Sequence, residues 1–389
     1  MMKKYLATFA LSALVLAACG KKEEPPAAAP APAPVASAPA PAPAPAEEKV
    51  LNIYNWPDYI PEGMIAAFEK ETGIKVNYDT FETNEALHAK LVAGSTGYDI
   101  VVPGSVFAKP QIEGGMFQPL DKAKIKNLAN LDAPIMATLA KNTDPDNKHL
   151  VPWAWGFTTV GINKTKVAKA LGKTPMPENA WDLVFKPEYT SKLKSCGIAY
   201  LDSPTEIIPV ALHYIGKDAY SNNAEDYKAA AEMLAKVRKD VRLFSSTMID
   251  DIAGGKACVV IGWSGDINIA AGRAKENKSK DEIESLLPST GALICFDTMA
   301  ITKDAKHPNN AMAFIDFYLR AENAALMTNE MNYPTANKAA VEKIKPEIAG
   351  NKTIFVEADY FAKMIAPSSF SNEAREAMAT AYNAFKKGK

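Results

Sequence analysis

The alternation of strands and helices between residues 50 and 102 is the feature that most constrains this fold. Residues 50–55 and 74–81 alternate apolar and polar side chains, and residues 98–102 form a short apolar run, as strands do. Residues 61–71 and 83–94 carry apolar side chains at helical spacing. This order predicts an α/β fold with a parallel sheet, whose ligands bind beyond the carboxyl ends of the strands.

The rest of the chain continues the alternation less clearly and contains no internal repeat. A domain typically takes roughly 100–200 residues, so a chain of 389 residues is expected to form about two lobes. The pattern predicts strands at residues 198–201, 257–263 and 292–301, and helices at residues 207–215, 311–319 and 375–385.

The first residues have the three-part layout of an export signal. Two lysines precede an apolar run at residues 5–18, which is too short to span a bilayer because spanning takes roughly 20 apolar residues. The run ends in Leu16-Ala17-Ala18-Cys19-Gly20, which resembles a bacterial lipobox. We therefore expect a lipoprotein signal peptide at residues 1–18, cut before a lipidated Cys19. A plain secretory signal with a chance cysteine is the alternative.

Residues 19–47 are expected to form a tether outside the fold. Proline and alanine dominate from Pro25 to Ala46, and such a stretch favours an extended chain of about 3.1 Å per residue that cannot bury a core. The tether would hold the body of the protein away from the lipid surface. We expect a location in the periplasm or cell envelope, with the lipid as the only membrane anchor.

Composition limits the partners of the body. The net charge is −1 and there is no basic stripe, so nucleic acid is not an expected partner. Nothing indicates a coiled coil or a large exposed apolar face, and we expect a monomer. An exported protein can keep a disulfide, but the residues alone do not decide which of Cys196, Cys258 and Cys295 pair.

The chain lacks the usual sequence marks of an enzyme or a metalloprotein. Its four histidines are not spaced as metal ligands, and H-E-x-x-H, Cys-x-x-Cys, P-loop and G-x-G-x-x-G motifs are absent. Gly262-Trp263-Ser264-Gly265 is followed by Asp266, so it is not a nucleophile elbow. We therefore expect no catalytic residue, no cofactor and no metal site.

A set of aromatic and carboxylate side chains lies near the expected strand ends. Aromatic faces attract ammonium groups and cover methylenes, and carboxylates accept charge-assisted hydrogen bonds from amines. The combination favours a site for an organic cation, although each residue alone is more often a core residue or a helix cap. The set comprises Trp56, Asp58, Tyr59, Asp202, Glu206, Trp263, Asp266, Phe296 and Asp297.

A series of motifs, in order along the body, gives a more specific indication. The motifs are Ile53-Tyr54-Asn55-Trp56, Phe68-Glu69-Lys70-Glu71-Thr72-Gly73-Ile74-Lys75-Val76, Ala93-Gly94-Ser95-Thr96-Gly97-Tyr98-Asp99, Phe117-Gln118-Pro119-Leu120-Asp121-Lys122, Lys194-Ser195-Cys196-Gly197, Ile261-Gly262-Trp263 and Ala336-Asn337-Lys338-Ala339-Ala340. Over about residues 49–389 the chain therefore resembles the bacterial polyamine-binding proteins, and most of all the putrescine-binding type.

This resemblance implies a two-lobed periplasmic-binding-protein fold of type II. A hinge of crossing strands would join the lobes, with the ligand in the cleft between them. The first lobe is expected at residues 48–153 and about 298–335, and the second at residues 154–297 and about 336–389.

The resemblance also implies the function. The protein would capture a polyamine and deliver it to an inner-membrane ABC permease that is driven by a separate ATPase, performing no chemistry itself. The alternatives are a binder of another small cationic molecule with the same fold, or a polyamine sensor.

Pocket residues carry over where the motifs match. Trp56 and Tyr59 resemble an aromatic wall of the first lobe, and Asp58 resembles an acidic contact there. The other implied polyamine contacts are Glu206, Trp263, Asp266, Asp297 and Tyr333. Cys196 and Cys258 match the disulfide of the putrescine-binding type, which leaves one cysteine unpaired.

Some positions depart from the putrescine-binding type and bear on specificity. Ser105 is a possible substitute for the serine that the putrescine-binding type has at position 104. Cysteine in place of an aromatic residue at position 295 is expected to widen the aromatic pocket. A serine at 203, where the spermidine-binding type has an aspartate, and the carboxylate at 266 both favour a diamine. We therefore expect putrescine first and spermidine next. The departures are Pro57, Gly104, Cys295 and Pro367, and the full set of possible further pocket residues is Gly104, Ser105, Ser203, Cys295, Phe296 and Pro367.

Overall fold

The structure is a computed structural model that describes residues 47–388. The expected signal peptide, Cys19 and the tether up to residue 46 lie outside the described residues. Within the described part, the strands form one nine-stranded sheet. They are β1 (Val50–Asn55), β2 (Lys75–Thr80), β3 (Ile100–Val101), β4 (Leu150–Asn163), β5 (Ile198–Leu201), β6 (Val241–Ser245), β7 (Val259–Trp263), β8 (Ile283–Ser285) and β9 (Leu293–Ile301).

Helices fill most of the connections between strands. Those before β5 are α1 (Met64–Thr72), α2 (Asn84–Ala93), α3 (Ser105–Glu113), α4 (Ala133–Asn142), α5 (Lys164–Leu171), α6 (Asp182–Phe185) and α7 (Pro187–Leu193). Those after β5 are α8 (Pro204–Tyr214), α9 (Ala224–Val237), α10 (Met248–Ala253), α11 (Ser264–Glu276), α12 (Pro308–Tyr318), α13 (Ala321–Met331), α14 (Pro346–Ala349), α15 (Ala358–Phe361) and α16 (Asn372–Lys387). Short 3-10 helices are η1 (Lys122–Lys124), η2 (Lys126–Asn130), η3 (Pro145–Asn147), η4 (Arg238–Asp240) and η5 (Lys338–Lys343).

The sheet is mixed rather than parallel throughout. Its order is β2-β1-β3-β9-β4-β7-β5-β6, with β8 paired to β4. The predicted parallel pairing is confirmed for β1 with β2 and β3. It is wrong for β9, which runs antiparallel to both β3 and β4, and for β4, which runs antiparallel to β7 and β8, whereas β5 is again parallel to β6 and β7. The sequence pattern did not reveal β4, since all of its residues are buried and a strand covered on both faces shows no alternation.

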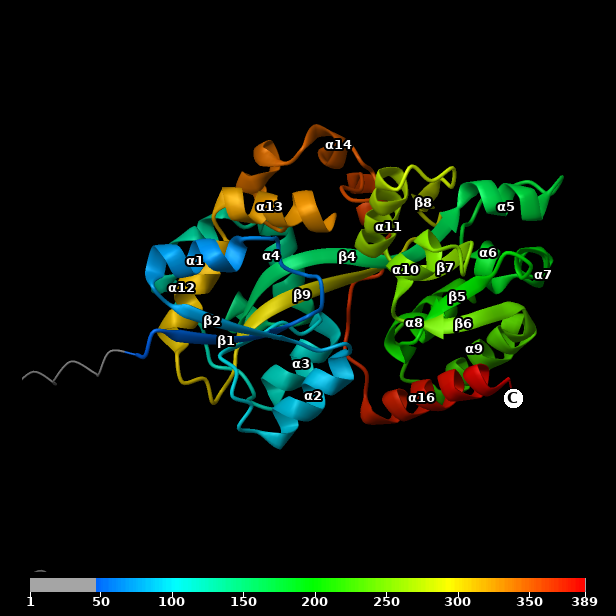
Figure 1. The fold of residues 1–389 in the computed structure, drawn as a ribbon. Coiled ribbons are helices and arrows are strands. Elements are labelled where there is room, and N and C mark those ends of the chain that lie inside the picture. The colour runs from blue at the N-terminus through cyan, green and yellow to red at the C-terminus, as the bar shows by residue number, and fades with distance from the viewer. Residues whose placement is uncertain (1–46, 389) are drawn as a thin grey trace, which may run out of the picture. The chain divides into compact units, whose positions relative to one another are not determined.

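β4 and β9 form the long antiparallel pair at the middle of the sheet. Leu150 lies opposite Ala300 at one end of the pair, and Thr158 lies opposite Leu293 at the other. In Figure 1 the two strands run side by side, with α1, α12 and α13 towards one end and α8, α9 and α16 towards the other. This pair is the arrangement expected of crossing strands.

The two ends of the pair belong to separate hydrophobic cores. The first core includes Phe68 of α1 and Phe314 of α12, and the second core includes Tyr200 of β5 and Phe385 of α16. Trp263 at the end of β7 packs against both cores. η5, which the sequence-based boundaries assign to the second lobe, packs on α13. The boundaries of the two lobes stay a prediction.

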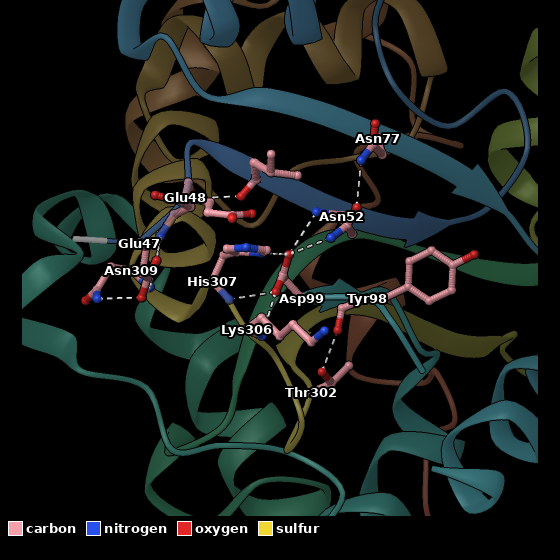
Figure 2. A network of polar contacts seen from close by, with 12 residues as sticks. Glu47, Glu48, Asn52, Asn77, Tyr98, Asp99, Thr302, Lys306, His307 and Asn309 are labelled. Carbon is pink, nitrogen blue, oxygen red and sulfur yellow. Dashed lines mark hydrogen bonds and ion pairs between the residues drawn. The ribbon is translucent and has the colours of Figure 1, made fainter. Parts of the chain in front are cut away.

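Asp99 ties β1 to the loop before α12 (Figure 2). The residue is 1% exposed. Its carboxylate accepts hydrogen bonds from Asn52 N at 2.9 Å and Asn52 Nδ2 at 3.3 Å, and from the backbone amides of Lys306 at 3.0 Å and His307 at 2.9 Å. His307 Nδ1 lies 3.0 Å from the same carboxylate. The network fixes the register of elements far apart in the sequence.

A disulfide joins Cys196 and Cys258 across 62 residues, and Cys295 is free. This confirms the predicted pairing. Closing a loop of this length restricts the unfolded chain and stabilises the fold by about 4 kcal/mol. Among residues 47–388, no helix combines the length and the apolar character needed to cross a bilayer.

Candidate functional site

A cavity of about 380 Å³ lies where the two cores meet, beyond the ends of β1 and β7 and against β9. All eight residues predicted to contact a polyamine line it: Trp56, Asp58, Tyr59, Glu206, Trp263, Asp266, Asp297 and Tyr333. Of the possible further pocket residues, Gly104, Ser105 and Cys295 also line it, together with the neighbouring Pro57. The structure therefore brings together segments that are more than 270 positions apart in the chain.

Asp297 lies in the middle of β9 and lines the cavity. Its carboxylate accepts a hydrogen bond of 2.8 Å from the Tyr59 hydroxyl. The pKa of Asp297 is raised to about 7, chiefly by burial and also by the charges of Glu206 and Asp266, while the Tyr59 hydrogen bond opposes the shift. Burial also raises the pKa of Tyr59 well above its usual value, so the phenol remains a neutral donor.

Asp266 lies in the first turn of α11. Its carboxylate accepts a hydrogen bond of 2.8 Å from the Tyr333 hydroxyl. Burial raises the pKa of Asp266 to about 6, and the hydrogen bond and the charge of Arg273 only partly offset this. The side chain is half-buried and lines the cavity.

Two glycines leave the space that the Tyr333 ring occupies. A Cβ atom on Gly265 would lie 2.1 Å from the Tyr333 ring, and one on Gly156 would lie 3.0 Å from it. Any larger residue at position 265 would therefore displace the ring and with it the hydroxyl that binds Asp266. Tyr59 meets the Tyr333 ring edge-on, with 5.2 Å between the ring centroids.

Glu206 lies in the first turn of α8 and forms the third carboxylate of the cavity. It accepts a hydrogen bond from the hydroxyl of Thr158 on β4. Burial raises the pKa of Glu206, and the hydrogen bond from Thr158 opposes this shift. The three deep carboxylates thus come from three different elements, and each has a neutral hydroxyl as its side-chain partner.

Aromatic rings enclose the space between these carboxylates. Trp56 and Trp263 meet edge to face, with 6.5 Å between ring centroids and an interplanar angle of 61°. Trp56 is fixed by a hydrogen bond of 3.0 Å from its Nε1 to the carbonyl of Val102. Both tryptophans line the cavity and give its wall aromatic surface.

The strand end at Gly104 is shaped by a neighbour that the sequence pattern did not single out. The Gly104 amide donates to Asn84 Oδ1 at 2.9 Å, and a Cβ atom at position 104 would lie 3.0 Å from Asn84 Nδ2. Asn84 also lines the cavity, so it supplies polar atoms near the place of the missing serine side chain. Ser105 points its Oγ towards the amide of Phe296 at 3.5 Å.

The cavity lining is strongly acidic in composition. Among its lining residues, Arg273 is the single basic one, and it lies 3.2 Å from Asp250 rather than on a deep carboxylate. Burial raises the pKa of the Cys295 thiol well above its usual value, so this group is neutral. The acidic lining residues are Asp58, Glu82, Glu206, Asp250, Asp266 and Asp297.

Three of the possible further pocket residues lie outside the cavity lining. Ser203 is 3.0 Å from the Thr205 hydroxyl, Phe296 is fully buried in a core cluster, and Pro367 is also buried. A ligand-contacting role for these residues stays a prediction. Among residues 47–388, no group of three or more histidine, cysteine or acidic side chains is arranged to hold a metal ion.

Pattern reasoning missed several lining residues and supports of the site. Thr158 lies in β4, and Gly156 is two positions before it, so neither could be recognised without the partner that each touches. Val106 and Phe107 line the cavity from the first turn of α3, directly after the predicted Ser105. The sequence signal that could have found Val106 and Phe107 is their position shortly after the strand predicted at residues 98–102.

The fold and this acidic, aromatic cavity define the class of protein. The chain belongs to the bacterial extracellular solute-binding proteins, whose family description it matches over residues 63–356. Their structures are periplasmic binding proteins of type II, which confirms the predicted fold class. The relatives are solute-binding transport proteins rather than enzymes.

Individual relatives make the resemblance more specific. The putrescine-binding periplasmic protein PotF of Escherichia coli (strain K12) is 45% identical over 320 residues, which cover 82% of this chain and 86% of the relative. The putrescine-binding periplasmic protein SpuD of Pseudomonas aeruginosa (strain UCBPP-PA14) is 42% identical over 344 residues, covering 88% and 93%. The solved spermidine/putrescine substrate-binding protein PotD of Streptococcus pneumoniae is 26% identical, with a TM-score of 0.73 and coverage of 88% and 99%. The predicted resemblance is confirmed.

Proposed function

We propose that this protein captures a polyamine in the cavity, with putrescine favoured and spermidine next, and delivers it to an ABC importer. One observation carries the proposal. Glu206, Asp266 and Asp297 line a single cavity, and their side-chain hydrogen-bond partners are neutral hydroxyls. Such carboxylates have spare acceptor capacity, and within residues 47–388 none of the three forms a salt bridge, because the lining Arg273 pairs with Asp250 instead.

An ammonium group supplies what these carboxylates lack. An ionised carboxylate enclosed by protein costs several kcal/mol of solvation unless it is paired with a cation. An amine that donates hydrogen bonds to it offsets that cost, and charge-assisted bonds of this kind are stronger than neutral ones. A neutral or anionic ligand would leave the carboxylates unpaired, so the cavity selects cations.

The aromatic residues account for the rest of a polyamine. Trp56 and Trp263 present faces that attract ammonium groups, and the same faces cover methylenes. Tyr59 and Tyr333 add apolar ring surface while their hydroxyls stay on the carboxylates. A chain with a charge at each end and methylenes between them fits this distribution of polar and apolar surface.

Several observations favour a diamine. The relatives with the identities given above are named for putrescine. Asp266 offers a carboxylate in the second half of the cavity, and Ser203 offers no acidic group for a further amine. Free Cys295 on the wall is smaller than an aromatic side chain and leaves room for a longer polyamine, which is why spermidine stands second.

We further propose that the protein works outside the cytoplasm as a lipid-anchored monomer. The relatives are named as periplasmic proteins. A lipid on Cys19 and the tether would keep the two lobes near an inner-membrane permease with its separate ATPase. The lobes would close over the ligand about the β4–β9 pair, as two-domain binding proteins do.

Calorimetric titration of protein stripped of bound ligand tests the proposal. The panel consists of putrescine, cadaverine, agmatine, spermidine and spermine, with 1,4-butanediol as a neutral control of similar length to putrescine. We expect the tightest binding for putrescine, weaker binding for spermidine and no heat for butanediol. Tightest binding of spermidine would reverse the order of the polyamines. Absence of heat with every amine would contradict the proposed function.

A further inference from the structure

α16 carries a cation in an unusual place. The helix packs on the second core through buried residues that include Met378 and Phe385, and it begins at the Ser371 cap. Arg375 lies in its first turns, where the partial positive charge of the helix N-terminus disfavours a cation. A residue that opposes the local preference indicates a partner outside the helix.

That partner lies on the other side of the cavity. The Arg375 guanidinium carbon is 5.8 Å from the centroid of the Phe107 ring, which is within the range of a cation–π interaction. Phe107 belongs to α3, which packs on α2 and β9, and it lines the cavity. In Figure 1 the N-terminal end of α16 lies next to α2 and α3.

Neighbouring groups on α2 and α3 support the same contact. His88 of α2 meets the Phe107 ring edge-on, with 6.0 Å between the ring centroids. Burial lowers the pKa of Arg375, and the negative charge of Glu85 on α2 opposes this shift. Burial lowers the pKa of His88, and the charge of Arg375 lowers it further. Val106, beside Phe107, packs directly against the second core. The contact therefore involves side chains of α2, α3 and α16.

We propose that Arg375 is a latch that holds the α2–α3 corner against α16 in the conformation described here and so lengthens the residence time of the ligand. Arg375 does not line the cavity, so it acts on the ligand through closure rather than by contact. Separating the two sides of the cavity would part the guanidinium from the ring, and a contact that has to break before release slows release more than it changes capture. The effect on the ligand rests on the proposed function.

The test compares Arg375→Ala with Arg375→Lys and with Glu376→Ala, which removes an exposed charge from the next position of the helix. Stopped-flow measurement gives the association and dissociation rates of putrescine. We expect Arg375→Ala to raise the dissociation rate about two- to five-fold, the scale of a partly exposed cation–π contact. The association rate should change less than the dissociation rate. Arg375→Lys should recover part of the effect, and Glu376→Ala should match the unsubstituted protein.

Hydrogen exchange provides a readout that does not depend on putrescine. In ligand-free protein, Arg375→Ala should speed exchange of the amides of residues 104–113 while leaving those of α9 unchanged. Unchanged exchange there together with an unchanged dissociation rate would overturn the latch. Faster exchange in both segments would mean that the substitution loosens the second lobe as a whole, which also contradicts the latch. If the unsubstituted protein binds no putrescine, the proposed function fails and the exchange result alone decides on the latch.

Discussion

Two carboxylate sites in this protein use the same chemistry in opposite ways. Asp99 is enclosed in the first core and accepts hydrogen bonds from three backbone amides and the Asn52 side chain, with His307 Nδ1 3.0 Å away. Asp297 in the cavity has one side-chain donor, the Tyr59 hydroxyl, and burial raises its pKa to about 7. The fold supplies the hydrogen-bond donors that the Asp99 carboxylate needs. The Asp297 carboxylate has fewer donors and keeps acceptor capacity for a ligand.

The difference separates stability from binding. A buried carboxylate with a full set of donors stabilises the fold, because removing it leaves those donors without an acceptor. A buried carboxylate with few donors costs stability in its ionised form and regains it when a cation binds. Substitutions at the two sites should therefore have different signatures, and the predictions below run from the largest expected effect to the smallest.

Asp99→Ala should destabilise the fold by about 3 to 5 kcal/mol, because the buried amides and the Asn52 side chain lose their acceptor. Urea denaturation followed by circular dichroism measures this loss. Asp359→Ala, which removes an exposed aspartate, is the matched control and should change the free energy of unfolding little. A loss below about 1 kcal/mol for Asp99→Ala would contradict the role assigned to the network.

Asp297→Asn should weaken putrescine binding by at least ten-fold, about 1.4 kcal/mol or more, since it removes the partner of a desolvated ammonium. The amide keeps the size of the carboxylate and can still accept from Tyr59. Calorimetric titration measures the affinity. The ligand-free variant should unfold at the same urea concentration as the unsubstituted protein, or at a higher one. Unchanged affinity would remove Asp297 from the site.

The stabilisation that putrescine confers should grow as the pH rises from 5 to 8. The folded-state pKa values of Asp297 and Asp266, about 7 and about 6, lie above the usual value of 3.8. In ligand-free protein their contribution to stability is fully present below about pH 4 and is lost as the pH rises through 6 and 7. Putrescine pairs with the ionised forms, so its affinity should fall by about ten-fold or more towards pH 5, where protons compete.

Thermal melts with and without putrescine across this pH range provide the measurement. The shift in melting temperature should be largest at pH 8 and smallest at pH 5. In Asp297→Asn the pH dependence should become shallower, because one of the two titrating groups is gone. A shift that is equal at both ends of the range would show that the cavity carboxylates do not exchange protons for ligand.

Cys295→Phe should change the preference among polyamines by a factor of about two to five. An aromatic ring at this wall would cover methylenes and narrow the cavity, which favours a short diamine over a longer chain. The ratio of putrescine to spermidine affinity, from competition titrations, is the measured quantity. Cys295→Ser keeps the side chain small and should leave the ratio unchanged. If the ratio of the two affinities is the same in both variants, residue 295 does not influence which ligand length the cavity prefers.

Strand ends and motif matches were the informative parts of the sequence. Trp56 and Asp58 follow β1, and Trp263 ends β7, so the rule that ligands bind beyond strand ends already placed these residues together. Glu206 was among the carboxylates whose pattern favoured a cation site, and the family resemblance gave it the more specific role of a polyamine contact.

The supports of the site could not be predicted, for a physical reason. Thr158 can donate its hydrogen bond to Glu206 only because β4 lies next to α8 in the fold. Gly265 has to be small only because the Tyr333 ring packs against it. Such contacts depend on pairing between distant segments, which single-residue patterns do not encode. The antiparallel β4–β9 pair was missed for the same reason, since β4 is buried along its whole length.

A crystal structure of the protein with putrescine would test the central claim most directly. The account predicts one ammonium within hydrogen-bond distance of Asp297 and the other within reach of Asp266 or Glu206, with the methylenes between Trp56 and Trp263. Putrescine bound elsewhere, or bound in the cavity with no amine on any of these three carboxylates, would contradict it.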